Sequence, residues 1–260
     1  MKRTAYIILL LVLSIQSKAT NQIEDILYYG QDKLHLYESP LEQIDNISLK
    51  IDNLKKNLSY SSDCHRSFYA EWTIINNELF LQNVYECNSN IKLNSTIEQI
   101  LGCKFKNGLM KANWVNGELW AGKDPVPEES LYITIFKHEY KFKFNNGYLN
   151  CENKFDYTPC KYDNEYNLNE FILKNIDKNI INEINKTGIE LSASVTSNNS
   201  GVIANITIDS SSKTIYNDEF IRVLKKLPCV KTYFYKGNFY CSTQSIVIKI
   251  YKEELDIYEE

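Results

Sequence analysis

Apolar and polar residues alternate with a period of two along much of the first half of the chain. The stretch 68–81 holds two such runs joined by Asn76-Asn77, and the stretch 110–121 holds two more joined by Asn116-Gly117. A period of two places the apolar residues on one face of a strand, and small polar pairs favour tight hairpin turns. The pattern predicts two β-hairpins that each direct one face into a core. Trp120 falls on the polar face of the second hairpin, where it is either an exposed aromatic contact or covered by a neighbouring segment, and the second arrangement is favoured.

Further strands and a short helix complete the predicted first half. The runs 131–136 and 140–144 alternate in the same way, and an asparagine-glycine sequence after them predicts a turn. Ser95 and Glu98 have the spacing of a capping box, which favours a helix that ends at Gly102. We therefore expect the first half to be mainly antiparallel sheet with short helices.

The second half begins with the spacing of a helix. Apolar residues recur every three or four positions over 168–184, alternate over 189–195 and 202–208, return to helical spacing over 217–227, and alternate again over 244–250. This pattern predicts the order helix, strand, strand, helix, strand.

The polar and irregular stretch 150–167 separates these halves and is the best candidate for a linker. We therefore expect an α+β fold of two small domains, 20–165 and 166–260. The 260 residues are 43% hydrophobic and 24% charged, which supplies enough apolar material for packed cores and too little charge for a disordered polymer.

The first residues are typical of an export signal. Lys2 and Arg3 precede an apolar run at 5–15, and small residues at 17 and 19 suit a signal peptidase. A run of about 11 residues is too short to cross a hydrocarbon core of about 30 Å. We expect residues 1–19 to be a cleaved signal peptide, the remaining chain to have no stable membrane span, and the protein to be periplasmic or secreted.

The charge of the chain is acidic and becomes more so after cleavage. The full sequence has a net charge of −4, and residues 1–19 contain three basic residues and no acidic one, so the remainder has a net charge of −7. This charge repels phosphate backbones and anionic membrane surfaces. We therefore expect no nucleic-acid partner.

Seven cysteines in an exported chain can form up to three disulfides. Cys151 with Cys160, and Cys229 with Cys241, would each close a short loop, and the sequence leaves the connectivity open. No two cysteines have the C-x2-C spacing of a zinc site, and the three histidines lie in separate segments. We expect no metal site, no cofactor and, because catalytic motifs are absent from the sequence, no enzymatic activity.

Three segments of the last third together resemble the TonB C-terminal domain: Gly188 to Ser211, Asp218 to Pro228, and Gln244 to Ile250. Family members carry a turn glycine where this chain has Gly201, a helix with an acid-rich start like Asp218-Glu219, and a last strand that closes the sheet. The resemblance implies an α-β-β-α-β domain that binds protein partners.

The sequence also departs from that family. It shows neither the inner-membrane helix nor the proline-rich spacer of energy-transducing members, so we do not expect it to harvest an ion gradient. The family's Tyr-Pro pair is missing, and the nearest candidate is Tyr157-Thr158-Pro159. The first half is similar, through 68–81 and 111–120, to exported bacterial proteins of unassigned function, which implies a bacterial envelope protein.

The last predicted strand, 244–250, is the main functional candidate. Its three isoleucines alternate toward the core, and its position at the end of a small sheet leaves backbone groups available to an extended peptide. We expect a non-catalytic protein–protein interaction module that binds an envelope protein or an extended peptide segment by strand addition. The outward side chains at this edge are expected to be Ser245, Val247 and Lys249.

Two alternatives belong to other functional classes. Cys64 precedes His65, and a histidine can activate a cysteine thiolate, so a periplasmic Cys-dependent hydrolase is one alternative. Adjacent residues of a strand face opposite ways, however, which favours a structural or disulfide role for Cys64. Trp120 raises the second alternative, a glycan-binding protein, because an exposed indole can stack on a sugar ring.

Overall fold

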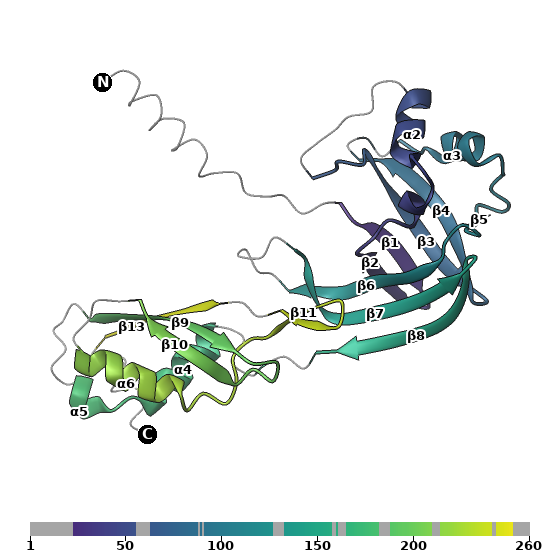
Figure 1. Ribbon diagram of the computed structural model, residues 1–260. Helices are drawn as coiled ribbons and strands as arrows, with labels where there is room; N and C mark the ends of the chain where they lie inside the picture. The colour runs from purple at the N-terminus through teal and green to yellow at the C-terminus, as the bar shows by residue number, and fades with distance from the viewer. Residues whose placement is uncertain are drawn as a thin grey trace, which may run out of the picture. The chain divides into compact units, whose positions relative to one another are not determined.

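The computed structural model describes residues 23–55, 63–87, 89, 91–126, 133–157, 160, 165–181, 188–209, 214–240 and 243–251 (Figure 1). The chain divides into two units, residues 1–155 and 156–260, and each is described separately below. The sequence pattern placed this boundary later, after residue 165. Helices and largely antiparallel strands make both units, so the fold class is α+β. The expected signal peptide lies outside the described residues.

The N-terminal unit is built around one curved sheet. Seven of its strands close into a ring, because the sheet has the order β3-β1-β2-β6-β7-β8-β4-β5 and β3 also pairs with β4. β1 and β3 run parallel, and the other pairs for which a register is defined run antiparallel. The strands are β1 (Asp25–Tyr29), β2 (Asp32–Leu36), β3 (Phe68–Ile75), β4 (Glu78–Glu86), β5 (Met110–Lys111), β6 (Gly117–Val126), β7 (Ile135–Asn145) and β8 (Tyr148–Asp156).

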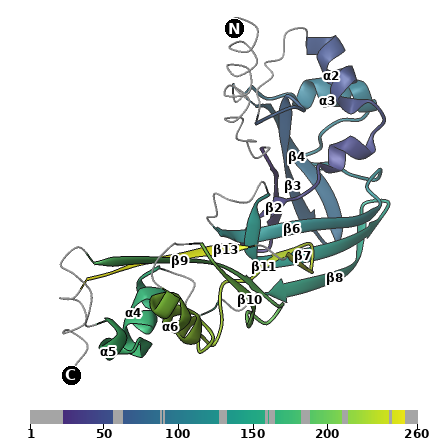
Figure 2. The same cartoon turned by 60° about the vertical axis from the view of Figure 1, so that its left-hand side comes forward.

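The core of this unit lies inside the ring and beneath its helices. Trp72, Phe68 and Phe142 are among its largest fully buried side chains. Helices α2 (Ile47–Lys55) and α3 (Asn94–Leu101) pack against each other beside β4, and both views show them together (Figures 1 and 2). A short 3-10 helix, η2 (Pro40–Gln43), precedes α2.

The first predicted hairpin is confirmed. β3 and β4 pair antiparallel, and the connecting residues Asn76 and Asn77 have φ angles of 51° and 62°, in the left-handed region that asparagine tolerates. The predicted turn between β7 and β8 also forms. It requires Gly147, because φ is 74° there and a Cβ atom would lie 2.5 Å from the carbonyl oxygen of Ala112.

The second predicted hairpin is wrong. β5 pairs with β4, whereas β6 lies between β2 and β7, so the two arms expected to pair across Asn116-Gly117 have different partners. The predicted strands 131–136 and 140–144 are likewise not separate, because β7 runs unbroken from Ile135 to Asn145. Alternation identifies a strand and its faces but carries no information about which strand lies beside it.

The C-terminal unit packs helices against one face of a three-stranded sheet with the order β10-β9-β13 (Figure 1). Apolar residues from α4, α6, β9 and β13 form its core. β11 and β12 make a separate hairpin. The elements are α4 (Glu165–Asn175), α5 (Lys178–Ile181), β9 (Ile189–Ser197), β10 (Ile203–Ile208), α6 (Thr214–Leu224), β11 (Tyr233–Tyr235), β12 (Asn238–Tyr240) and β13 (Gln244–Ile250).

The helix predicted over 168–184 is interrupted. α4 ends at Asn175, and Asp177 then caps the start of α5, because its Oδ1 accepts a hydrogen bond of 2.9 Å from the backbone N–H of Asn179. Aspartate favours such a cap over a helix interior, which explains the break within a continuous apolar pattern.

Candidate functional site

β13 forms one edge of the C-terminal sheet. It pairs with β9 over seven consecutive residues without a shift in register, and among the described residues no other strand pairs with it. Within such a ladder, alternate residues direct their N–H and C=O groups to the neighbouring strand, and the intervening residues direct theirs the other way. The outer margin of β13 therefore presents a row of backbone donors and acceptors.

The side chains of β13 alternate between core and solvent. Ile246, Ile248 and Ile250 are buried against the helices, whereas Val247 is 44% exposed. Ser245 and Lys249 are also exposed. The structure thus brings the three residues singled out from the sequence onto the outward face of an edge strand.

Lys249 forms an ion pair with Glu190, which lies opposite it on β9, and the Nζ to Oε2 distance is 3.1 Å. The hydrogen bond to Glu190 raises the pKa of Lys249 above its ordinary value. Both side chains are exposed, so this pair adds little to stability. The positive charge of the edge therefore lies at one end of it, next to Glu190, while Ser245 and Val247 have neutral side chains.

The opposite edge of the same sheet is less regular. The pairing of β10 with β9 shifts in register between Ile203 and Asn205. Such irregularities twist an edge and interrupt its row of backbone groups, which disfavours the addition of another strand. β13 is therefore the better site for strand addition.

A polar clamp braces the helices behind this sheet. Glu219 of α6 accepts hydrogen bonds of 2.6 Å from Arg222 and from the backbone N–H of Asp177. Arg222 also donates to the carbonyl oxygen of Asn175, at the end of α4, at 2.7 Å. The hydrogen bond from Arg222 lowers the pKa of Glu219. The clamp fixes α4, α5 and α6 relative to one another and so supports the apolar face of β13.

Trp120 is covered by neighbouring residues, which is the arrangement that the sequence favoured over an exposed contact. Its side chain is 9% exposed, and its ring stacks on that of Phe155 with 5.3 Å between the ring centroids. The ammonium group of Lys141 lies 5.5 Å from its ring centroid. The indole is therefore already covered by residues of the N-terminal unit, and the glycan-binding alternative loses the open aromatic surface on which it depended.

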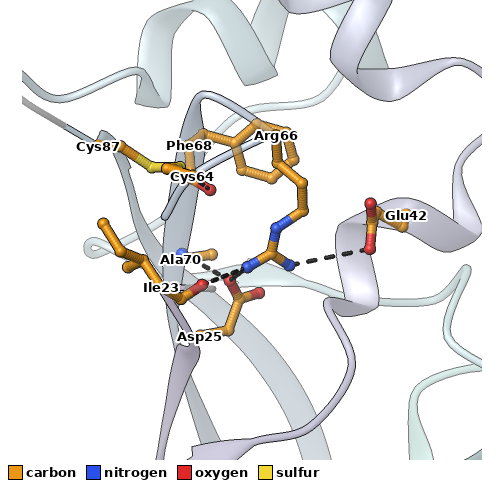
Figure 3. The surroundings of a disulfide bond; sticks show 8 residues. All are labelled: Ile23, Asp25, Glu42, Cys64, Arg66, Phe68, Ala70 and Cys87. Atoms are coloured by element: carbon orange, nitrogen blue, oxygen red, sulfur yellow. Dashed lines mark hydrogen bonds and ion pairs between the residues drawn. A yellow bond between two sulfur atoms is a disulfide. The ribbon is translucent and has the colours of Figure 1, made fainter. Parts of the chain in front are cut away.

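Cys64 is bonded to Cys87 in a disulfide and is 2% exposed (Figure 3). A cysteine in a disulfide has no thiol to ionise, so it cannot serve as a nucleophile. The adjacent His65 is exposed. The hydrolase alternative therefore lacks its proposed catalytic cysteine in this structure, and Cys64 instead joins the start of β3 to the end of β4.

The two short-loop disulfides considered from the sequence are not formed. Cys160 pairs with Cys229, while Cys151 is a free and exposed thiol. Cys241 lies outside the described residues, and its considered partner Cys229 is already bonded. Pairing depends on which cysteines the fold brings within reach, and the number of residues between them does not determine this.

A buried carboxylate lies close to the first disulfide. Asp25 is 1% exposed and accepts hydrogen bonds from the hydroxyl of Ser39 at 2.8 Å, the backbone N–H of Ala70 at 3.1 Å and the indole N–H of Trp72 at 3.0 Å. Arg66 forms an ion pair with it at 3.4 Å. Burial raises the pKa of Asp25, and Arg66 opposes that effect. These groups enclose the carboxylate, which indicates a structural role.

Arg66 connects this carboxylate to two other segments of the N-terminal unit. Its guanidinium donates a hydrogen bond of 2.7 Å to the carbonyl oxygen of Ile23 and lies 3.8 Å from Glu42 of η2 (Figure 3). Asp25 and Arg66 together therefore tie β1, β3 and η2 into one assembly beside the Cys64–Cys87 disulfide.

A tyrosine-rich group on the N-terminal unit was not anticipated from the sequence. Tyr28, Tyr69 and Tyr85 surround Glu71 across β1, β3 and β4. The sequence contained part of the information needed to find this group. Tyr69 and Glu71 alternate with the inward residues of the first hairpin and must therefore point outward. The contribution of Tyr28 depends on the β1–β3 pairing, which local periodicity does not reveal.

The described part of the chain contains neither a metal-binding cluster nor a membrane-spanning helix. Within it, no three or more histidine, cysteine, aspartate or glutamate side chains are grouped so that they could hold a metal ion. Nor does that part contain a helix with the length and apolar character needed to cross a bilayer.

Comparison of the chain with protein-family models, curated proteins and solved structures finds no match. The function therefore has to be inferred from the chemistry of the chain's own residues, in which the regular edge of β13 is the strongest feature.

Proposed function

We propose that this chain is a non-catalytic protein–protein interaction module of the bacterial envelope, exported through residues 1–19, and that it binds an extended segment of a partner protein along β13. The resemblance of the last third to TonB C-terminal domains supports binding of a protein partner. The sequence pattern of residues 1–19, which is typical of an export signal, supports a periplasmic or secreted location.

The observation that carries this proposal is the regular edge of β13, which pairs with β9 alone among the strands that the structure describes. A partner strand would extend the sheet order to β10-β9-β13-partner and hydrogen-bond to the outward backbone groups of β13. Because those groups belong to the backbone, they supply affinity for many sequences. Selectivity would come from the side chains on the two faces of the added strand.

The side chains of β13 indicate what such a partner segment should contain. On the helix-covered face, its residues would extend the layer formed by Ile246 and Ile248, so apolar residues are favoured there. On the open face, an apolar residue would suit Val247, and an acidic residue would suit Lys249. Cross-strand pairs of these kinds contribute about 0.2–1 kcal/mol each. The preferred ligand is thus a short alternating segment with one acidic position.

Site-specific photo-cross-linking in cells tests the proposal. A photoreactive residue at position 247 should yield a discrete covalent adduct with a partner, whereas the same residue at Thr207, an exposed position on β10, should not. The double variant Ser245→Lys/Val247→Lys should abolish the adduct formed from a photoreactive residue at Lys249, because charges along an edge oppose strand addition. Thr207→Lys is the matched control and should leave that adduct unchanged.

Two results would count against strand addition at this edge. One is equal cross-linking from positions 247 and 207, which would indicate non-specific contact. The other is an adduct from position 249 that persists in the Ser245→Lys/Val247→Lys variant, which would place the partner away from the edge of β13.

A further inference from the structure

A polar and aromatic cluster lies on the face of β1, β3 and β4 that points away from the core of the N-terminal unit. It consists of Tyr28, Tyr69, Glu71, Asn83 and Tyr85, referred to below as the Glu71 cluster. Each of these side chains is half-buried. The strand register accounts for the grouping, because Tyr69 lies opposite Tyr85, Glu71 lies opposite Asn83, and β1 runs alongside β3.

Glu71 is surrounded by neutral donors. Its carboxylate accepts hydrogen bonds from the hydroxyls of Tyr28 and Tyr85, each at 3.3 Å, and from the amide of Asn83 at 2.7 Å. Among the described residues, no basic side chain lies within 4.0 Å of the Glu71 carboxylate. A half-buried negative charge without a counter-ion attracts cations from outside the chain.

The aromatic rings of the cluster favour the same kind of ligand. The rings of Tyr69 and Tyr85 stack with 5.2 Å between their centroids. Lys92 already places its ammonium group 5.6 Å from the centroid of Tyr85, and it donates to Asn83 at 3.0 Å. Asn83 therefore stands between this lysine and Glu71. Lys92 therefore lies at the rim of the cluster and forms no ion pair with Glu71.

The titration of the tyrosines agrees with a negative potential at this place. The pKa values of Tyr28, Tyr69 and Tyr85 are raised. Burial is the larger cause, and the negative charge of Glu71 is the second. A cation brought near these hydroxyls would offset the part of that effect that comes from Glu71.

We propose that the Glu71 cluster binds the guanidinium group of an arginine side chain presented by a partner protein. A planar guanidinium can stack on a tyrosine ring and donate a charge-assisted hydrogen bond to Oε1 of Glu71, which accepts only one hydrogen bond within the described part of the chain, and an ammonium group cannot combine these two contacts in the same way. The net negative charge of the chain also favours a basic partner. This site is separate from the edge of β13.

The test is a titration of the full-length protein with the peptide acetyl-Gly-Arg-Gly-amide, followed by NMR of the tyrosine side chains. The same peptide with citrulline in place of arginine is the neutral comparison. We expect saturable binding of the arginine peptide and binding of the citrulline peptide that is about tenfold weaker, because one charge-assisted contact is lost.

Two variants are expected to change binding of the arginine peptide in opposite directions, which distinguishes a change in the binding site from a general disturbance of the fold. Glu71→Gln should weaken binding of the arginine peptide about tenfold, whereas Lys92→Gln should strengthen it severalfold by removing a like charge. Glu78→Gln is the matched control on the same sheet, because Glu78 is already paired with Lys111, and it should leave binding unchanged.

The proposal would be overturned by the absence of saturable binding up to about 10 mM peptide. Equal binding of the arginine and citrulline peptides would overturn it as well, as would unchanged affinity in Glu71→Gln. If cellotetraose bound to the same tyrosines and the arginine peptide did not, the cluster would be a saccharide site instead.

Discussion

Replacement of Asp25 by alanine should severely destabilise the N-terminal unit. The change removes the acceptor for three buried donors, on Ser39, Ala70 and Trp72, and it leaves Arg66 without its closest carboxylate. Each unsatisfied buried donor costs about 1–3 kcal/mol, and loss of one partner of a buried ion pair costs about 3–5 kcal/mol. These costs overlap because the four groups share one site and can relax together. We therefore expect a loss of about 3–5 kcal/mol.

Asp25→Asn should cost less, about 1–3 kcal/mol, because asparagine fills the same volume and keeps one acceptor oxygen. The assay is urea unfolding followed by tryptophan fluorescence. All three tryptophans, at positions 72, 114 and 120, lie in the N-terminal unit, so the signal reports on that unit alone.

Asp32→Asn is the control for this experiment. Asp32 is partly exposed and pairs with Lys123 at the surface, so its replacement should cost less than about 1 kcal/mol. If Asp25→Ala were no more destabilising than Asp32→Asn, the carboxylate would not be the structural anchor that its contacts indicate.

Three further outcomes are expected from the same physical reasoning. Ser67 is fully buried with a φ of 64°, and its Oγ has no hydrogen-bond partner among the described residues, so Ser67→Gly should raise the free energy of unfolding by about 1 kcal/mol in urea titrations. Gly122→Ala should lower it by about 1–3 kcal/mol in the same assay, because a Cβ there would lie 2.1 Å from the ring of Phe136. The pKa of Glu219 is lowered in the folded state, so its stabilising effect is present above about pH 4.5 and is lost as the pH falls through the folded value. The stability difference between wild type and Glu219→Gln, measured by circular dichroism, should therefore shrink on acidification; a constant difference would contradict the assigned pairing with Arg222.

Sequence periodicity predicted the strands better than their partners. The hairpin of β3 and β4 could be predicted from the run 68–81, because both of its signals are local: the alternation of apolar and polar residues, and the asparagine pair that forms the turn. The ring closes where β4 meets β8, through contacts between residues far apart in the sequence. Glu78 pairs with Tyr148, and the N–H of Leu79 donates a hydrogen bond of 2.8 Å to the carbonyl oxygen of Gly147. Such contacts join segments distant in sequence, and no local pattern encodes them.

The same distinction separates the parts of the candidate sites that could be predicted from those that could not. The outward direction of Ser245, Val247 and Lys249 follows from strict alternation, which is a local property. The burial of Trp120 depends on Phe155 of β8, and the disulfide of Cys64 depends on the β3–β4 pairing. Both required knowledge of which strands lie side by side.

Amide hydrogen exchange across β13 in the isolated protein is the most direct test of the central claim that this strand offers an open edge. Every second amide from Gln244 to Ile250 should exchange rapidly while the intervening amides, bonded to β9, are protected. Protection of all these amides in the isolated chain would contradict the claim, because it would show that another segment already occupies the edge.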